Sequence, residues 1–154
     1  MATDYGKIVE DLLAFYDFRD KTVVAVGAGG GQLIEYGRPA RKVIAVDSDP
    51  GALEKLRENL RAAGLESKFD PVLCDFNRAE MTGDAVLKVR MSWRAVEDYP
   101  IRKRQSFRAI HAFKSYEELF LKVKSQGETS LRRIEKFRNE TDISIPMIYE
   151  MALI

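Results

Sequence analysis

The feature that most constrains this chain is a glycine-rich turn that follows directly on a short apolar run. Residues 22–26 (TVVAV) are apolar or β-branched throughout, which is typical of a strand buried on both faces. Gly27, Gly29 and Gly31 come next, and glycine allows both positive φ angles and a close approach of the backbone to a ligand. The turn by itself is a weak signal, because similar turns also serve packing alone. In this position it indicates an α/β fold with a ligand at the carboxyl ends of parallel strands.

The segments that follow continue an alternation of strands and helices. A short helix is predicted at 32–36, directly after the glycine turn, and its N-terminal amides are expected to point at the same ligand. Asp49 and Pro50 provide the cap and first turn of a helix that ends at Gly64. Further strands are predicted at 42–47 and 69–74, and a fourth is predicted to begin at 84–87. The pattern predicts an α/β, Rossmann-like doubly wound fold, with a mostly parallel sheet, helices on both faces and the first strand at the centre of the sheet.

The whole chain of 154 residues is predicted to form a single domain. It divides into an N-terminal helical segment (1–20, with the helix at 7–18), a cofactor-binding half (21–87) and a C-terminal half (88–154). In the C-terminal half we expect helices at 89–99, at 115 to about 124 and at 130–137, and strands at 105–113 and 146–154.

The composition restricts the partners of the chain. With 25 basic and 24 acidic residues, the net charge does not imply a strongly electrostatic partner such as duplex DNA. Cys74 is the single cysteine, so an intramolecular disulfide is excluded, and no cluster of metal-ligand residues is present, so no metal is expected. The chain begins without the pattern of a signal peptide, and no run approaches the roughly 18 apolar residues of a membrane span. We expect a cytoplasmic protein.

Polar and aromatic residues stand at the ends of the second and third predicted strands. Asp47 follows Gly27 by twenty residues, and a carboxylate in this place can accept hydrogen bonds from both hydroxyls of a ribose. Asp75 could accept from an adenine amino group, while Phe76 packs on the ring. Each acid also has a simpler interpretation: Asp47 as a residue that precedes a helix, and Asp75 as a loop acid.

Two nucleotide-binding motifs do not fit this sequence, and their absence restricts the classes of nucleotide that the site could bind. The dinucleotide fingerprint G-x-G-x-x-G/A would place a small residue where Gln32 stands, and no Gly-Lys-Ser/Thr follows to make a P-loop. The segments VVAVGAGGG, VIAVDSDPGALEKLRENL and PVLCDF instead resemble the class I S-adenosylmethionine (SAM)-dependent methyltransferases, over Thr22 to about Leu87.

This resemblance implies a SAM site at the three strand ends and a sheet whose final strand is antiparallel. It implies a glycine loop beside the methionine part of SAM, an acid on the ribose and residues around adenine. The predicted cofactor-binding residues are Gly27, Ala28, Gly29, Gly31, Asp47, Ser48, Asp75 and Phe76. One departure stands out: the family usually has an acid two residues before the first glycine, and here that residue is Ala25.

The junction after the fourth strand is unusually abrupt. The family sheet has a helix, a fifth strand and another helix after this point, but here residues 88–93 already resemble the later helix. A crossover needs at least about 10–12 residues. We therefore predict that a segment of several tens of residues between Leu87 and Lys88 is absent from this sequence, by omission or by deletion. The alternative is a compact variant in which Val86–Met91 forms one complete strand.

These features favour a SAM-dependent methyltransferase that acts on a small molecule. The alternative is a non-catalytic domain that binds SAM or its demethylated product S-adenosylhomocysteine (SAH); a nicotinamide-dependent oxidoreductase is disfavoured by Gln32.

Methyl transfer needs no catalytic triad, so the catalytic residues cannot be named from sequence. The sole histidine, His111, is expected to be packed or exposed rather than a base. The basic stretch from Lys88 to Arg108 could contact an anionic substrate or RNA, although a solvated helix face is the simpler interpretation. The acceptor and oligomeric state stay open.

Overall fold

The structure, a computed structural model, describes residues 2–78, 81–90 and 101–153. It contains a seven-stranded sheet in the order β1-β6-β7-β5-β2-β3-β4. The chain separates into two compact units. The smaller unit comprises Met1–Asp4 and Arg108–Ile148, and the larger unit comprises Tyr5–Phe107 and Tyr149–Ile154. The single domain predicted from sequence stays a prediction, and each unit is described by itself below.

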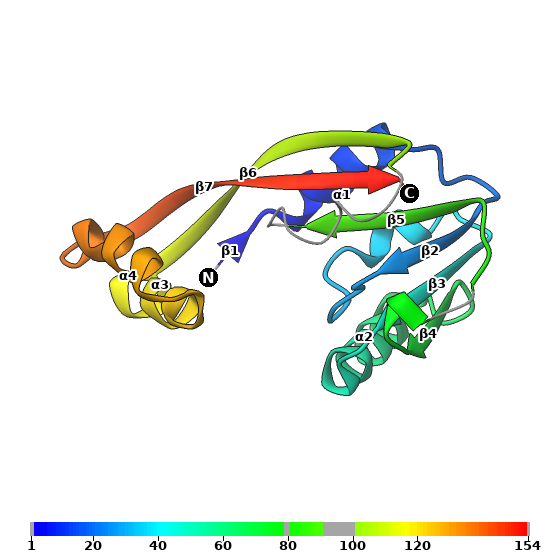
Figure 1. Cartoon of the computed structure of the whole chain (residues 1–154), viewed down its shortest axis with the longest axis horizontal. Helices are drawn as coiled ribbons and strands as arrows, with labels where there is room; N and C mark the ends of the chain where they lie inside the picture. Colours follow the sequence, from blue (N-terminus) through cyan, green and yellow to red (C-terminus); the bar gives the residue numbers. More distant parts are fainter. Residues whose placement is uncertain (1, 79–80, 91–100, 154) are drawn as a thin grey trace. The chain divides into compact units, whose positions relative to one another are not determined.

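The parallel strands of the larger unit are those expected from sequence (Figure 1). They are β2 (Thr22–Val26), β3 (Lys42–Asp47), β4 (Phe69–Leu73) and β5 (Ala85–Arg90). β2 pairs in parallel with both β3 and β5, and β3 pairs in parallel with β4. Four consecutive residues of β2 are buried, so both of its faces are covered. The Rossmann-like α/β class and the interior position of the first parallel strand are confirmed.

Helix α2 (Pro50–Ala63) ends where its sequence signals predicted. The side chain of Asp49 accepts a hydrogen bond from the amide of Gly51 at 2.9 Å, and Pro50 occupies the first turn. Gly64 closes the helix with a φ of 67°, a left-handed conformation that favours glycine. The buried stripe of the helix consists of Leu53, Leu56 and Leu60.

The helix predicted at 7–18 is present as α1 (Tyr5–Phe15), which buries Ile8, Leu12 and Phe15, but it begins two residues before Lys7 and ends three residues before Phe18. The helix predicted at 32–36 is the other correction. A four-residue 3-10 helix, η1 (Ile34–Gly37), forms there in its place, bounded by turns on both sides. Such a short 3-10 turn does not direct a row of free amides at the glycine loop, so the helix N-terminus expected beside the loop is not formed.

Strand β5 continues without interruption through the junction between Leu87 and Lys88. Leu87 and Lys88 are consecutive residues of this strand and pair in antiparallel register with Leu153 and Ala152 of β7 (Thr141–Leu153). The helix predicted from Lys88 is therefore wrong for residues 88–90, and residues 91–99 of the predicted helix lie outside the described residues. The antiparallel direction of the final strand, β7, agrees with the resemblance.

The strand order bears on the proposed missing segment. Within the described residues, β5 pairs directly with β7, and no parallel strand lies between them. A compact variant accounts for this order, and so does a sequence that lacks the fifth strand of the family. The absent segment therefore stays a prediction.

The smaller unit has its own hydrophobic core. This unit includes β1 (Ala2–Thr3), the second part of β6 (Lys103–Ser115) and the first part of β7. β1 pairs antiparallel with β6. Between β6 and β7 lie α3 (Tyr116–Val123), η4 (Lys124–Gln126), α4 (Glu128–Ile134) and η5 (Glu135–Phe137) (Figure 1). The core residues are Phe113, Leu119, Ile134 and Ile143.

The elements predicted for this part of the sequence are largely present. Ser115 caps α3 by accepting from the amide of Glu118 at 3.3 Å, as its capping pattern predicted. β6 is longer at both ends than the predicted strand 105–113, and β7 starts at Thr141 rather than at Pro146. His111 is 3% exposed, so it is a packed residue, and burial lowers its pKa.

Candidate cofactor site

The ends of β2 and β3 are joined by the carboxylate of Asp47. Its Oδ2 accepts from the amide of Gly29 at 2.8 Å, and its Oδ1 accepts from the amide of Asp49 at 3.0 Å. The amide of Gly27 also donates to the carbonyl of Val46 at 2.8 Å. The glycine loop and the acid predicted to bind ribose are therefore in direct contact. Each carboxylate oxygen keeps a lone pair for a further donor, which a ribose diol could supply.

The three predicted glycines of the loop have positive φ angles: 65° for Gly27, 60° for Gly29 and 85° for Gly31. Their surroundings differ. A Cβ on Gly27 would meet no atom within 4 Å, whereas a Cβ on Gly31 would lie 2.8 Å from Cδ1 of Leu56. The first glycine thus borders open space that a ligand can enter, and the third permits close packing against α2.

The end of β4 connects to the same place. The amide of Cys74 donates to the carbonyl of Asp47 at 3.0 Å, and Asp75 and Phe76 follow directly. The side chain of Asp75 is 52% exposed, and one of its oxygens lies 3.9 Å from Nε of Arg78. Phe76 opens the 3-10 turn η2 (Phe76–Arg78) and is half-buried.

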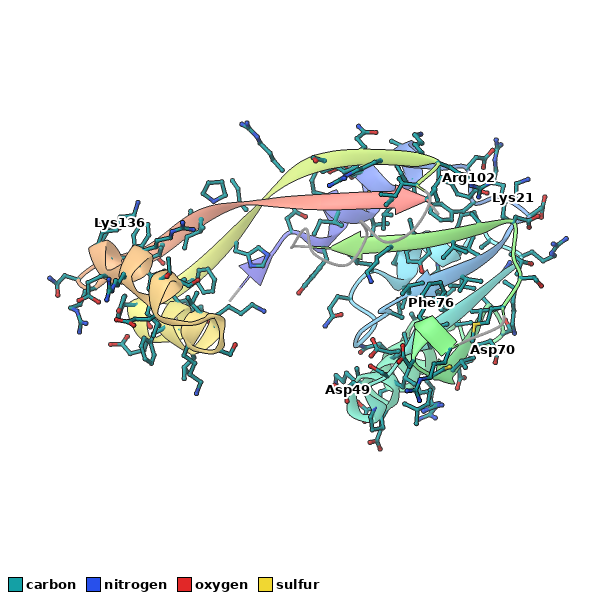
Figure 2. The ribbon with its side chains drawn as sticks, viewed as in Figure 1. Lys21, Asp49, Asp70, Phe76, Arg102 and Lys136 are labelled. Atoms are coloured by element: carbon teal, nitrogen blue, oxygen red, sulfur yellow. The ribbon has the colours of Figure 1, made fainter. Side chains whose placement is uncertain are left out.

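Phe76 packs against a hydrophobic cluster built from β2 and β3. The buried members of this cluster are Val24, Val26 and Val46. The remaining predicted site residues lie nearby along the chain: Ala28 donates its amide to the carbonyl of Val46 at 3.2 Å, and Ser48 is exposed directly after Asp47. Asp49 and Phe76 lie on the same side of the larger unit in Figure 2, away from Lys21, which precedes β2.

This arrangement fits an adenosyl ligand. The carboxyl ends of three neighbouring parallel strands carry an open glycine loop, a half-buried carboxylate, and an exposed acid next to an aromatic ring. Such an edge is where open α/β sheets bind nucleotides. The geometry brings all the predicted residues to one edge of one unit. Their individual roles toward a ligand stay predictions.

One contact of the loop was not predicted from sequence. Nδ2 of Asn59 on α2 donates to the carbonyl of Gly30 at 2.5 Å, in a half-buried position. Asn59 follows Leu56 by three residues, at the edge of the buried stripe of the helix. A polar residue beside an apolar stripe was the available signal, because a half-buried polar group needs a partner.

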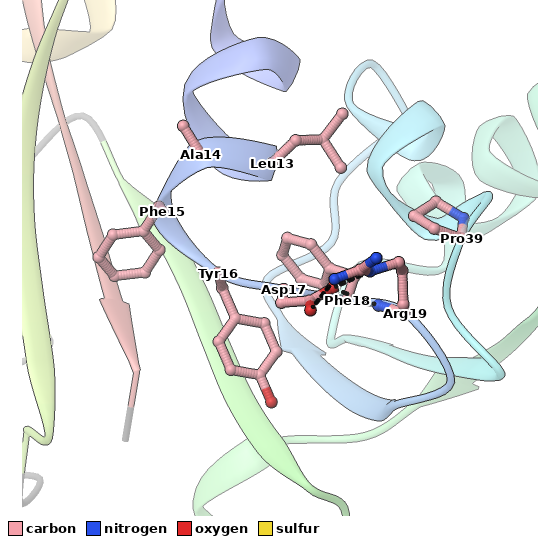
Figure 3. Close-up of a pocket in the computed structure, with 8 residues that line it drawn as sticks. All are labelled: Leu13, Ala14, Phe15, Tyr16, Asp17, Phe18, Arg19 and Pro39. Carbon is pink, nitrogen blue, oxygen red and sulfur yellow. Dashed lines mark hydrogen bonds and ion pairs between the residues drawn. The ribbon is translucent and has the colours of Figure 1, made fainter.

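A cavity of about 500 Å³ lies elsewhere in the larger unit (Figure 3). It is lined by the end of α1 and the segment that leads into β2, together with Pro39. Asp17 and Arg19 form an ion pair on its wall, and the guanidinium lowers the pKa of Asp17 to about 2. This cavity is at the amino ends of the strands, and none of its lining residues belongs to the predicted cofactor site.

The basic stretch of the sequence is not a helix face where it is described. Lys88 and Arg90 belong to β5, while Lys103 and Arg104 belong to β6. Lys103 is used within the fold, since its ammonium donates to the carbonyl of Phe15 and lies 4.6 Å from the centre of the Phe15 ring. Arg94 lies outside the described residues.

Neither a metal site nor a membrane-spanning helix is found in the described part of the chain. It contains no group of three or more His, Cys, Asp or Glu residues that could hold a metal ion. Its helices are also too short and too polar to cross a membrane.

Comparison with known proteins links the chain to methyltransferases. The model of a family described as RNA cap guanine-N2 methyltransferase matches residues 20–140. The tRNA (guanine(37)-N(1))-methyltransferase Trm5b of Methanocaldococcus jannaschii is 34% identical over 65 residues, which cover 42% of this chain and 19% of that protein. The ribosomal protein L11 methyltransferase of Alteromonas mediterranea is 37% identical over 75 residues, which cover 46% of this chain and 25% of that protein. The chain thus matches a quarter or less of these curated relatives.

Solved structures support the fold. A putative RNA methyltransferase from Pyrococcus horikoshii matches with a TM-score of 0.56 at 14% identity, over 96% of this chain and 82% of that chain. Trm5 of Methanocaldococcus jannaschii, in complex with adenosine, matches with a TM-score of 0.56 at 16% identity, over 99% of this chain and 48% of that chain. At these identities the likeness shows the fold alone.

Proposed function

Because the chain belongs to the RNA cap guanine-N2 methyltransferase family, within the class I SAM-dependent methyltransferases, we propose that it transfers the methyl group of SAM to an RNA. The observation that carries the cofactor part of this proposal is the contact between Gly29 and Asp47 inside the matched region. It brings the glycine loop next to the acid at the end of the neighbouring strand, at the edge where open α/β sheets bind nucleotides.

The residues of the site have distinct roles in this proposal. Asp47 accepts from the ribose hydroxyls with the lone pairs that Gly29 and Asp49 leave free. The open side of Gly27 admits the methionine part, while Asp75 and Phe76 bind the adenine edge and face. SAM, when bound, would supply the methyl group of its sulfonium, which would pass in line to the acceptor atom as the carbon–sulfur bond breaks and SAH leaves. The protein aligns the acceptor and excludes water.

The acceptor is proposed from the family and from one curated relative. The family description and Trm5b both name RNA, whereas the second relative modifies a ribosomal protein. The small-molecule acceptor predicted from sequence has no support from these matches. RNA is therefore the acceptor class to test first, with protein and small molecules as the competing outcomes.

Isothermal titration with SAM and SAH tests the cofactor site. We expect both to bind, and we expect Asp47→Asn to weaken both at least tenfold, because an amide offers one acceptor oxygen where a carboxylate offers two. Asp70→Asn is the matched control, since Asp70 is an exposed acid near the amino end of β4, away from the carboxyl ends of the strands, and it should leave binding unchanged. No binding of either ligand, or preferential binding of NAD, would overturn the proposed site.

Transfer of a radiolabelled methyl group tests the acceptor. The protein is incubated with labelled SAM and separately with total RNA, ribosomal protein and a small-molecule extract. Label in RNA that disappears after ribonuclease treatment supports the proposal. Label in protein or small molecules instead would contradict RNA as the acceptor while leaving the methyltransferase assignment intact.

Binding without transfer is the second candidate function. The observation that favours it is Ala25, which is 6% exposed within β2 and pairs with Ala45 and Leu87, so the position usually held by an acid carries only a methyl group. A protein that binds SAM and SAH but labels none of the three acceptor classes would be a cofactor-binding domain of this kind.

A further inference from the structure

Helix α2 packs against Gly30 and Gly31 of the glycine loop, whereas a Cβ on Gly27 would meet no atom within 4 Å. Cδ1 of Leu56 would lie 2.8 Å from a Cβ on Gly31, and Cγ of Lys55 would lie 3.3 Å from a Cβ on Gly30. The loop therefore has an open side next to Gly27 and a packed side against the helix. The contacts between the loop and α2 therefore help to determine the position of the open side.

Asn59 makes the polar contact of this packed side. Its Nδ2 donates to the carbonyl oxygen of Gly30, across 29 residues of sequence and in a half-buried position. Removal of the donor would leave that carbonyl with one fewer hydrogen-bond partner in a half-buried place, which is unfavourable.

The contact of Asn59 complements that of Asp47. Asp47 accepts from the amide of Gly29, and Asn59 donates to the carbonyl of Gly30, so two consecutive glycine residues are held from two different elements. Glycine has the largest conformational freedom of any residue, and a loop of this composition needs such restraints to keep one shape.

We infer that Asn59 is a positioning residue that fixes the glycine loop in the shape that receives the methionine part of SAM. This inference rests on the proposed function, because the loop matters only if a SAM-type ligand binds there. Asn59 itself touches no ligand atom; it acts through the carbonyl of Gly30.

The inference predicts a selective effect on the two parts of the ligand. Adenosine would bind through the ends of β3 and β4, at Asp47, Asp75 and Phe76, and its link to the loop would be the contact of Asp47 with Gly29 rather than that of Asn59 with Gly30. SAM and SAH add the methionine part, which would need the Gly30 side of the loop in one shape. A merely structural role for Asn59 would weaken adenosine and SAM alike.

The test compares the affinities of the full chain for SAM, SAH and adenosine by isothermal titration. Asn59→Asp keeps the size of the side chain but replaces the donor by a carboxylate that repels the Gly30 carbonyl. We expect this variant to bind SAM and SAH about tenfold more weakly, equivalent to about 1.4 kcal/mol, with adenosine within about twofold of the unmodified protein. Asn59→Gln, which keeps an amide donor, should recover part of the loss.

Glu54→Gln is the matched control, because Glu54 is an exposed residue of the same helix; it should leave all three affinities unchanged. If Asn59→Asp does not fold, Asn59→Ser supports the same comparison. An equal loss for adenosine and SAM, or no loss for either, would overturn the role of Asn59. Failure of the unmodified protein to bind any of the three ligands would instead overturn the proposed function.

Discussion

Single glycines in the cofactor loop are required for different physical reasons, which a substitution can separate. Gly27 has a φ of 65° and open space beside it, whereas Gly31 has a φ of 85° and Leu56 against it. Adding a Cβ at either position introduces the backbone strain of a left-handed residue, which destabilises the fold by about 1–2 kcal/mol. At Gly31 the added Cβ also clashes with the packed interior.

We expect Gly31→Ala to lower the free energy of unfolding by more than Gly27→Ala, because its Cβ would approach Cδ1 of Leu56 to 2.8 Å and Cγ2 of Ile34 to 3.3 Å. Gly27→Ala should act mainly on the affinity for SAM. Urea unfolding and SAM titration of both variants check this. The reverse order of stabilities would show that the side of Gly31 is not packed as described.

Tyr36 makes the stability of the protein sensitive to alkaline pH. It is 7% exposed and lies 5.1 Å from Phe18 and 6.2 Å from Phe69, between ring centres, and burial raises its pKa well above the usual value. Below pH 10 the hydroxyl is protonated in both states. Above about pH 10 only the unfolded chain ionises, so stability falls as the pH rises, by up to about 1.4 kcal/mol per pH unit.

We therefore expect Tyr36→Phe to lose less stability than the unmodified protein between pH 9 and pH 11, by about 1 kcal/mol or more. Tyr5→Phe is the control, because Tyr5 is 37% exposed and should follow the unmodified protein. Urea unfolding at both pH values provides the measurement. Parallel pH dependence of all three proteins would contradict the effect of burial at Tyr36.

At the scale of elements, local sequence signals predicted both ends of α2 correctly. For residues 32–36 the local pattern predicted a helix, but the structure has the 3-10 helix η1 there. Asp49 and Gly64 act on their own neighbours, through a cap contact and a left-handed closure. Between Gly31 and Gly37 the chain is constrained from outside, since a Cβ on Gly37 would lie 2.4 Å from the ring of Phe69. A short 3-10 turn results where the residue pattern alone favoured a helix.

Removal of the cap of α2 should measure this local contribution. Asp49→Ala loses the hydrogen bond from the amide of Gly51 and should lower the free energy of unfolding by about 1 kcal/mol. Glu54→Ala, an exposed change on the same helix, should cost far less. Chemical denaturation followed by circular dichroism distinguishes the two, and equal losses would argue against Asp49 as the cap.

At the scale of the whole molecule, the smaller and larger units have separate cores, and this predicts separable defects. Leu119 is 1% exposed among Phe113, Ile134 and Ile143, and its truncation to alanine should cost about 2–5 kcal/mol. We expect Leu119→Ala to speed amide hydrogen exchange across residues 108–148 while the affinity for SAM stays unchanged. Leu121→Ala, at a position 60% exposed, should alter neither. Loss of SAM binding in Leu119→Ala would show that the site depends on the smaller unit.

The sequence by itself determined the strands from Thr22 to Leu73, the capped helix between them and the residues at the strand ends, because each depends on hydrophobic period, capping and glycine placement over a few residues. Tertiary structure alone decided that β5 pairs with β7, that Gly31 meets Leu56 and that Asn59 holds Gly30. Those contacts join residues that are distant along the chain. Their energy comes from packing and from satisfying half-buried polar groups, and neither is encoded in any short run of residues.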